Sequence, residues 1–194
     1  MERKIVCFLT AVIVFASMAL SALSAEPTIP KDERKLTTLG KYVTSVEAYE
    51  MWKAAPDKVK IIDCRTPEEY VFVGHAPMAY NVPSMLWTDK WNEEKKNYDM
   101  KDNPDFEARM KEISPPDGVI MIMCRSGHRS AASVNRLANA GFTNIYSIID
   151  GFEGDKIAEE DSFFKGKRLK NGWRNSIEPW TYDLDSKLVY APGK

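Results

Sequence analysis

The chain has little cysteine and almost no net charge, and each shortage excludes a class of protein. Three cysteines occur in 194 residues, Cys7, Cys64 and Cys124, which is too few for a small scaffold held together by disulfides. The formal net charge is -1, so bulk electrostatics favour neither nucleic acid nor an anionic membrane as a partner. The sequence also lacks internal repeats and low-complexity tracts. Stability must therefore come from a packed core.

Only one long hydrophobic run is present, from Ile5 to Leu20. It follows a basic start at residues 1–4 and precedes a cluster of small residues at 21–25, which is the layout of a secretory signal peptide. Cleavage that removes residues 1–24 would also remove Cys7. We therefore expect a periplasmic or secreted protein without stable membrane insertion. The alternative is an uncleaved anchor, because the run approaches the ~20 residues that span a bilayer.

After a polar linker predicted at 25–40, the sequence alternates between segments of strand length and segments with helical spacing. Strands are predicted at 41–44, 59–64, 80–83, 118–124 and 144–149. Helices are predicted at 44–55, 67–74, 105–113 and 130–141. This order predicts an α/β fold with a central, mostly parallel five-stranded sheet that is flanked by helices.

One long segment, residues 84–117, interrupts this alternation. It is charged and aromatic, and we predict that it is an insertion covering one edge of the sheet. The alternative is a docking surface for a partner protein. The domain as a whole is predicted to span 41–182, with a C-terminal tail at 183–194, and Trp173 and Trp180 are expected to pack back on the domain.

The candidate reactive group is Cys124, which directly follows the buried strand predicted at 118–124. It begins the polar loop Cys124-Arg125-Ser126-Gly127-His128-Arg129, which leads into a helix. Ligands of α/β sheets bind at the carboxyl ends of the strands. Inward-pointing backbone N–H groups and the helix N-terminus both favour a thiolate over a thiol. Cys124 is therefore predicted to be a nucleophile.

Two arginines of this loop indicate that it holds an anion. Arg125 and Arg129, with His128 between them, lie where the helix dipole disfavours cations by ~0.3–1 kcal/mol each. Their alternative role is to pair with surface carboxylates. Four residues separate Cys124 from Arg129, one fewer than in cysteine phosphatases. The smaller ring suits a sulfur atom carried on the cysteine, and it disfavours a phosphatase or an arsenate reductase.

Several motifs in order resemble the rhodanese family across residues 40–182. Its first signature is matched at 61–65, Glu69-Tyr70, 74–77 and 81–83, and its active-site loop at 124–130. Its closing segment is matched at 150–154, 172–173 and 179–180.

The resemblance implies a sulfurtransferase that works in two half-reactions. Cys124 would take sulfane sulfur from thiosulfate or a polysulfide, and a thiophilic acceptor would then remove it from the persulfide. The residues that would bind the substrate are Arg125, Ser126, Gly127, His128 and Arg129. The loop amides would hold the persulfide, Arg129 the oxyanion, and Arg125 would assist at the rim. No metal or organic cofactor is implied, and the acceptor could be a protein.

The alternative function is a catalytically weak module that carries polysulfide and docks to another exported protein. Three further residues are predicted to be structural: His75 as a hydrogen-bonded turn residue, and Asp63 with Arg65 as an ion pair near the site. Cys64 is either a core residue or a resolving thiol for Cys124, since the family's strand order places the two side by side.

Overall fold

The structure, a computed structural model, describes residues 28–176 and 179–191. The predicted signal peptide at 1–24 lies outside these residues. Within them, no helix is both long and apolar enough to cross a bilayer.

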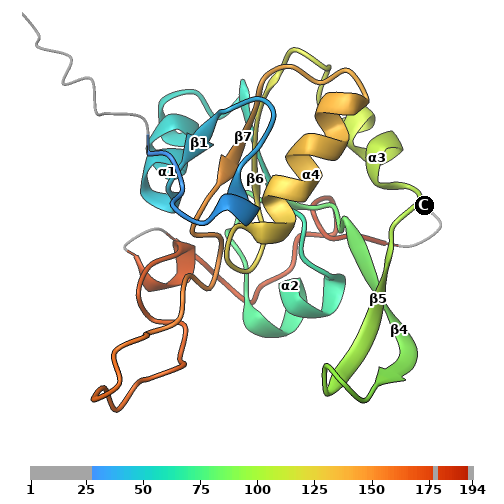
Figure 1. Cartoon of the computed structure of the whole chain (residues 1–194). Coiled ribbons are helices and arrows are strands. Elements are labelled where there is room, and N and C mark those ends of the chain that lie inside the picture. Colours follow the sequence, from blue (N-terminus) through green and yellow to red (C-terminus); the bar gives the residue numbers. More distant parts are fainter. Residues whose placement is uncertain (1–27, 177–178, 192–194) are drawn as a thin grey trace, which may run out of the picture.

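The core of the molecule is a five-stranded sheet in which every pairing is parallel, in the order β1-β7-β6-β2-β3 (Figure 1). The strands are β1 (Tyr42–Val43), β2 (Val59–Asp63), β3 (Tyr80–Asn81), β6 (Val119–Met123) and β7 (Ile145–Ile148). The two central strands are almost entirely buried, because both of their faces are covered by helices or loops. The predicted five-stranded parallel sheet is confirmed.

Helices cover both faces of the sheet. They are α1 (Ser45–Ala54), α2 (Pro67–Val73), α3 (Phe106–Ile113) and α4 (His128–Asn139), with short 3-10 turns η1 (Glu33–Lys35) and η2 (Trp173–Asn175). Thr44 and Glu47 form the predicted capping box of α1. Two apolar clusters fill the space between the layers: one lies against α3 and α4, the other against α1 and the buried Trp173.

The segment at 84–117 does not cover the sheet edge as predicted. Its first part is a two-stranded antiparallel hairpin, β4 (Met85–Asn92) and β5 (Asn97–Asp102), which projects from the body (Figure 1). Aromatic side chains pair across it, with Trp91 opposite Tyr98. The edge strand β3 is instead covered by the C-terminal segment, where the Asn81 N–H donates to the Leu188 carbonyl at 2.8 Å.

The linker predicted at 25–40 is packed on the domain over its described residues, 28–40. The Thr38 N–H donates to Asn135 Oδ1 on α4 at 2.8 Å. Lys35 is buried and forms an ion pair with Asp155 at 3.0 Å. This segment therefore covers the flank of α4, next to the loop that carries Cys124.

Candidate active site

Cys124 lies at the carboxyl end of β6, at the start of the loop that leads into α4, as the sequence predicts. The helix begins at His128, two residues before the predicted start at 130. The preceding Gly127 takes a left-handed conformation, with φ 98°, which turns the chain sharply into the helix. The loop is therefore a tight arc around the Cys124 sulfur.

The arc points a backbone N–H group at the sulfur and directs two of its carbonyls away from it. The Gly127 N–H donates to Cys124 Sγ at 3.2 Å, and the Ser130 hydroxyl lies 3.8 Å from the same sulfur. The carbonyl oxygens of Cys124 and Arg125 accept hydrogen bonds from the backbone N–H groups of Phe152 and Glu153, at 2.7 and 2.9 Å. These bonds hold the carbonyls away from the sulfur, so the cradle presents donors to an anion.

Two glycines allow the segments around the cradle to approach one another closely. A Cβ on Gly127 would lie 2.2 Å from the Ile149 carbonyl oxygen, and one on Gly151 would lie 2.5 Å from the Cys124 carbonyl oxygen. Gly151 also has φ +64°, a conformation that costs other residues energy. The Cys124 loop and the loop after β7 can therefore pack this closely only because residues 127 and 151 are glycines.

The surroundings of Cys124 favour its ionised form. Burial alone raises the pKa of this thiol, but several groups outweigh burial and hold the pKa well below its usual value. They are a hydrogen bond from the Cys64 thiol, the Arg129 guanidinium, and the backbone N–H groups of Ser126 and Ser130. These groups therefore favour the thiolate, which is the nucleophilic form of the side chain.

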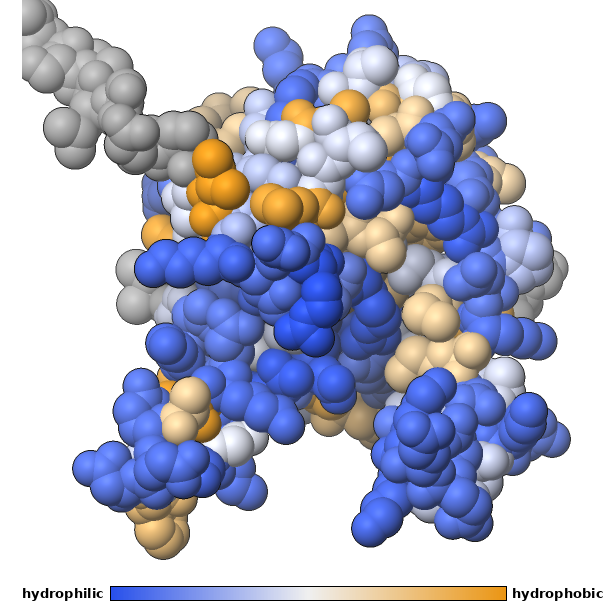
Figure 2. Space-filling view, in the orientation of Figure 1, coloured by the Kyte–Doolittle hydropathy of each residue, from blue (hydrophilic) through white to orange (hydrophobic). Residues whose placement is uncertain are grey.

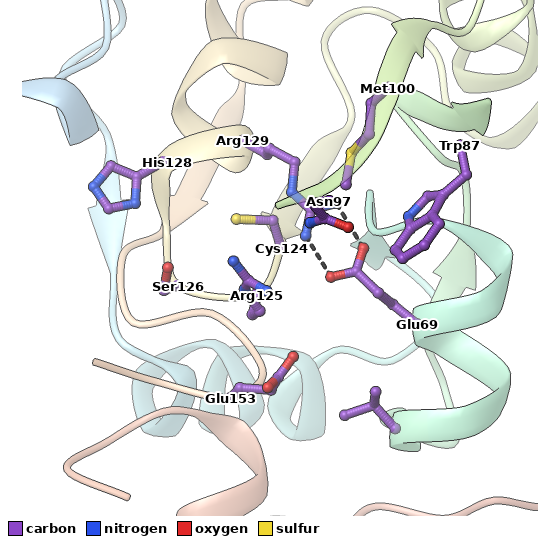
Figure 3. Close-up of a pocket in the computed structure, with 11 residues that line it drawn as sticks. Glu69, Trp87, Asn97, Met100, Cys124, Arg125, Ser126, His128, Arg129 and Glu153 are labelled. Atoms are coloured by element: carbon purple, nitrogen blue, oxygen red, sulfur yellow. Dashed lines mark hydrogen bonds and ion pairs between the residues drawn. The ribbon is translucent and has the colours of Figure 1, made fainter. Parts of the chain in front are cut away.

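Arg129 does not point freely into the cradle. Its guanidinium makes two hydrogen bonds to the Glu69 carboxylate, both 2.6 Å long, and Glu69 itself caps α2 through the Thr66 N–H (Figure 3). Arg129 thus pairs with a carboxylate, but not with a surface carboxylate as in the predicted alternative, because both side chains are largely buried and line the pocket. The charge of Arg129 still lowers the pKa of Cys124. Because Glu69 neutralises much of this charge, Arg129 attracts a substrate anion in the pocket less strongly.

The other loop residues have different positions around the sulfur. Arg125 is exposed and forms no ion pair with any residue that the structure describes. Burial, and next the Arg125 guanidinium, lower the pKa of Arg168. Ser126 is buried and acts through its backbone. The His128 ring turns away from Cys124 and pairs with Asp32 at 2.8 Å (Figure 3).

A pocket of about 440 Å³ opens onto Cys124. Besides the loop it is lined by Glu69, Val73, Trp87, Asn97, Met100 and Glu153. The hairpin supplies Trp87, Asn97 and Met100, so the unpredicted element forms one wall of the site (Figure 3). These lining residues were not predicted from the sequence. The alternation of Trp87 with Trp91, and of Tyr98 with Met100, is the signal that could have revealed two facing strands.

The residues predicted to be structural behave as predicted. Asp63 and Arg65 are both fully buried and pair at 2.6 Å. The His75 ring stacks on Tyr70 at 3.8 Å between centroids and contacts the backbone carbonyls of Tyr70 and Asp183. Within the described ranges, no group of three or more histidine, cysteine or acidic residues is placed to hold a metal ion.

Comparisons with known proteins agree with this architecture. The model of the rhodanese-like domain matches residues 46–158. An uncharacterized protein of Rickettsia rickettsii is 32% identical over 142 residues, which cover 72% of this chain and 96% of that protein. Thiosulfate sulfurtransferase 16 of Arabidopsis thaliana, a chloroplast protein, is 34% identical over 93 residues, which cover 48% of this chain and 70% of the plant protein.

Among solved structures, Rv0390 from M. tuberculosis superposes with a TM-score of 0.55 at 27% identity, over 74% of this chain and all of that one. The family model covers more than half of the sequence. The chain therefore belongs to the family of rhodanese-like domains.

Proposed function

We propose that the protein is a sulfurtransferase that moves sulfane sulfur through a persulfide on Cys124. The observation that carries this proposal is the amide cradle, in which the Gly127 N–H donates to Cys124 Sγ while the loop carbonyls bond elsewhere. Such a cradle stabilises a thiolate before the reaction and the persulfide anion after it.

In the first half-reaction, the Cys124 thiolate attacks the outer sulfur of thiosulfate. A sulfur–sulfur bond forms on Cys124, the bond to the sulfonate sulfur breaks, and sulfite leaves with that electron pair. In the second, a thiophilic acceptor attacks the outer sulfur and Cys124 leaves as the thiolate. Arg125 is the exposed cation at the rim, so it is the first group to guide the donor anion, and Arg129 stabilises charge on the sulfur.

The pocket has room for more than thiosulfate. Its wall includes the apolar side chains of Val73, Trp87 and Met100, which suit the chain of a polysulfide or the organic part of a thiol acceptor better than a small hydrophilic anion. We therefore propose that polysulfides are accepted as donors alongside thiosulfate.

The test is thiocyanate formation from thiosulfate and cyanide, with wild type compared with Cys124→Ser. The proposal predicts turnover by wild type and none by the variant. It is wrong if neither thiosulfate nor polysulfide yields thiocyanate and neither modifies Cys124. Turnover of an aryl phosphate without any sulfur uptake would instead favour a cysteine phosphatase.

One observation favours a second candidate, a carrier that docks to another protein. The hairpin and residues 156–170 form two projections at the same end of the molecule, both largely hydrophilic (Figure 2). The hairpin also exposes Trp91 and Tyr98, at 47% and 44%. If the protein is such a carrier, polysulfide should form a persulfide on Cys124, which an alkylating agent present during loading would trap. Thiocyanate should not be produced.

We also propose that the protein is exported, on the pattern of residues 1–24 alone. Expression of the full chain in a bacterial host tests this, by N-terminal sequencing of the periplasmic fraction. A start at residue 25 supports cleavage, and an intact N-terminus in the membrane fraction supports the anchor.

A further inference from the structure

The two cysteines in the described part of the chain occupy matching positions on neighbouring strands. β2 and β6 pair in parallel up to Asp63 opposite Met123, so the next residues are Cys64 and Cys124. The Cys64 N–H continues the ladder by donating to the Met123 carbonyl at 2.8 Å. Adjacent strands lie ~4.8 Å apart, which is within the Cα separations of ~4.4–6.8 Å that a disulfide requires.

Both side chains also point to the same face of the sheet. Cys64 and Cys124 belong to the apolar cluster beneath α3 and α4, whereas Met123 belongs to the cluster on the opposite face. Both thiols are free. The pair thus has the spacing and the direction that a sulfur–sulfur bond needs.

Cys64 and the pocket lie on different sides of the reacting sulfur, Cys124 Sγ. Cys124 lines the pocket, and Cys64 does not: it is fully buried behind Cys124, among Ile62, Val82 and Ile122. A sulfur atom added to Cys124 from the pocket would therefore lie on the far side of Sγ from Cys64. This is the arrangement for in-line displacement, with the nucleophile in the core and the leaving sulfur in the pocket.

We infer that Cys64 is a resolving thiol, which attacks the Cys124 persulfide and releases its outer sulfur as hydrosulfide. The Cys64–Cys124 disulfide bond forms, the bond from Cys124 Sγ to the outer sulfur breaks, and that sulfur leaves with the electron pair. The Cys64 thiol gives up one proton to solvent as the disulfide forms, and the leaving sulfur, on the opposite side of Sγ, takes one proton from water in the pocket, so protons and electrons balance. No added oxidant is needed, because the persulfide sulfur is itself reduced, and an external dithiol reopens the disulfide by exchange.

The environment of Cys64 favours a protonated thiol until the step begins. Burial, and next the hydrogen bond with Cys124, raise the pKa of the Cys64 thiol well above its usual value. Before loading, therefore, the pair favours the proton on Cys64 and the negative charge on Cys124, and Cys64 releases that proton as it attacks. Apolar neighbours alone would pack as well around valine, so packing gives no reason for a thiol here.

The experiment compares wild type with Cys64→Val and Cys64→Ser, and rests on persulfide formation as proposed above. Each reduced protein is mixed with thiosulfate without an acceptor, and hydrosulfide, sulfite and intact mass are measured under non-reducing conditions. Thiosulfate is the donor because loading releases sulfite, so that hydrosulfide reports the second step alone. Cys64→Ser guards against a packing effect, since it keeps a hydrogen-bonding group but has no nucleophilic sulfur.

For wild type we expect about one equivalent of hydrosulfide per chain, a mass about 2 Da below the reduced protein, and a disulfide-linked pair of peptides. For both variants we expect a stable gain of about 32 Da and no hydrosulfide. A wild-type persulfide that persists while Cys64 stays free overturns the inference and leaves the sulfurtransferase intact. Sulfite release from none of the three proteins, with no gain in mass, overturns both.

Discussion

The reactivity proposed for Cys124 depends on where its neighbours place their charges and dipoles. It is 1% exposed, and burial would normally suppress a thiolate. The loop amides, the Cys64 thiol and the Arg129 guanidinium reverse that effect. Activity should therefore follow the ionisation of this one sulfur.

The first prediction concerns pH. Because the pKa of Cys124 lies well below the usual value of a thiol, the rate of sulfur loading should stay flat from neutral pH upward and fall as pH drops through the lowered pKa. Cys64→Val should shift this fall to higher pH, since it removes a donor to the thiolate. Thiolate absorbance in the ultraviolet, with Cys124→Ser as the blank, checks both. A transition of wild type at or above the ordinary thiol pKa would contradict the account.

The second prediction concerns Glu69, which holds Arg129. Glu69→Gln removes one negative charge from the pocket and frees the guanidinium for a donor anion, so the KM for thiosulfate should fall by about threefold to tenfold. A glutamine keeps the cap on the Thr66 N–H. The control is Glu68→Gln, an exposed neighbour that forms no ion pair with the described residues; its KM should not change. An equal change in both variants would show that Glu69 has no particular role.

At the scale of the elements, the loop after β7 fixes the shape of the cradle. The third prediction is that Gly151→Ala impairs sulfur loading by at least about tenfold, because its Cβ would press on the Cys124 carbonyl and the Ser126 N–H, 2.5 and 2.7 Å away. Gly40→Ala is the matched control, since Gly40 has a similar φ of +60° but nothing within 4 Å. Both variants carry the same backbone strain of about 1 kcal/mol, so equal loading by both would contradict the argument.

The regular elements of the sheet and its helices are predictable because their signals are local. The capping box at Thr44 and Glu47, and the apolar run before Cys124, are visible in the sequence and confirmed in the structure. The hairpin was missed because its strands are rich in charged residues and largely exposed, so no clear alternation of apolar and polar residues marks them. Its role as a pocket wall follows from tertiary placement, which no local pattern encodes.

The candidate site was also predictable only in its local features. Cys124 and its loop follow from the position of a buried strand before a helix, but the partner of Arg129 does not. Glu69 lies 60 positions away in sequence, and its contact with Arg129 arises because α2 begins beside the loop. The pairing of Cys64 with Cys124 follows from the register of β2 and β6, which the sequence suggests only through the family's strand order.

At the scale of the whole molecule, the buried ion pair of Asp63 and Arg65 connects the elements that surround the site. Arg65 pairs with Asp63, donates to the Gly74 carbonyl at 2.8 Å, and lies over the Phe152 ring at 4.1 Å. It thereby joins β2, the end of α2 and the segment that holds the loop carbonyls. Loss of this pair should destabilise the entire domain rather than one element.

The fourth prediction is that Asp63→Asn lowers the free energy of unfolding by about 3–5 kcal/mol, because it leaves the Arg65 charge buried without its counter-ion. The control is Glu112→Gln, which breaks an exposed ion pair with Arg109 and should cost less than about 1 kcal/mol. Urea unfolding monitored by tryptophan fluorescence measures both. Similar midpoints for the two variants would contradict the structural role of Asp63.

The most direct test of the central claim is a rapid-mixing measurement of sulfite after thiosulfate is added to the reduced protein at neutral pH. If Cys124 is ionised in its cradle, wild type should release a burst of about one equivalent of sulfite per chain, and Cys124→Ser should release none. The absence of a burst from a folded wild-type protein whose Cys124 thiol is free would contradict the account.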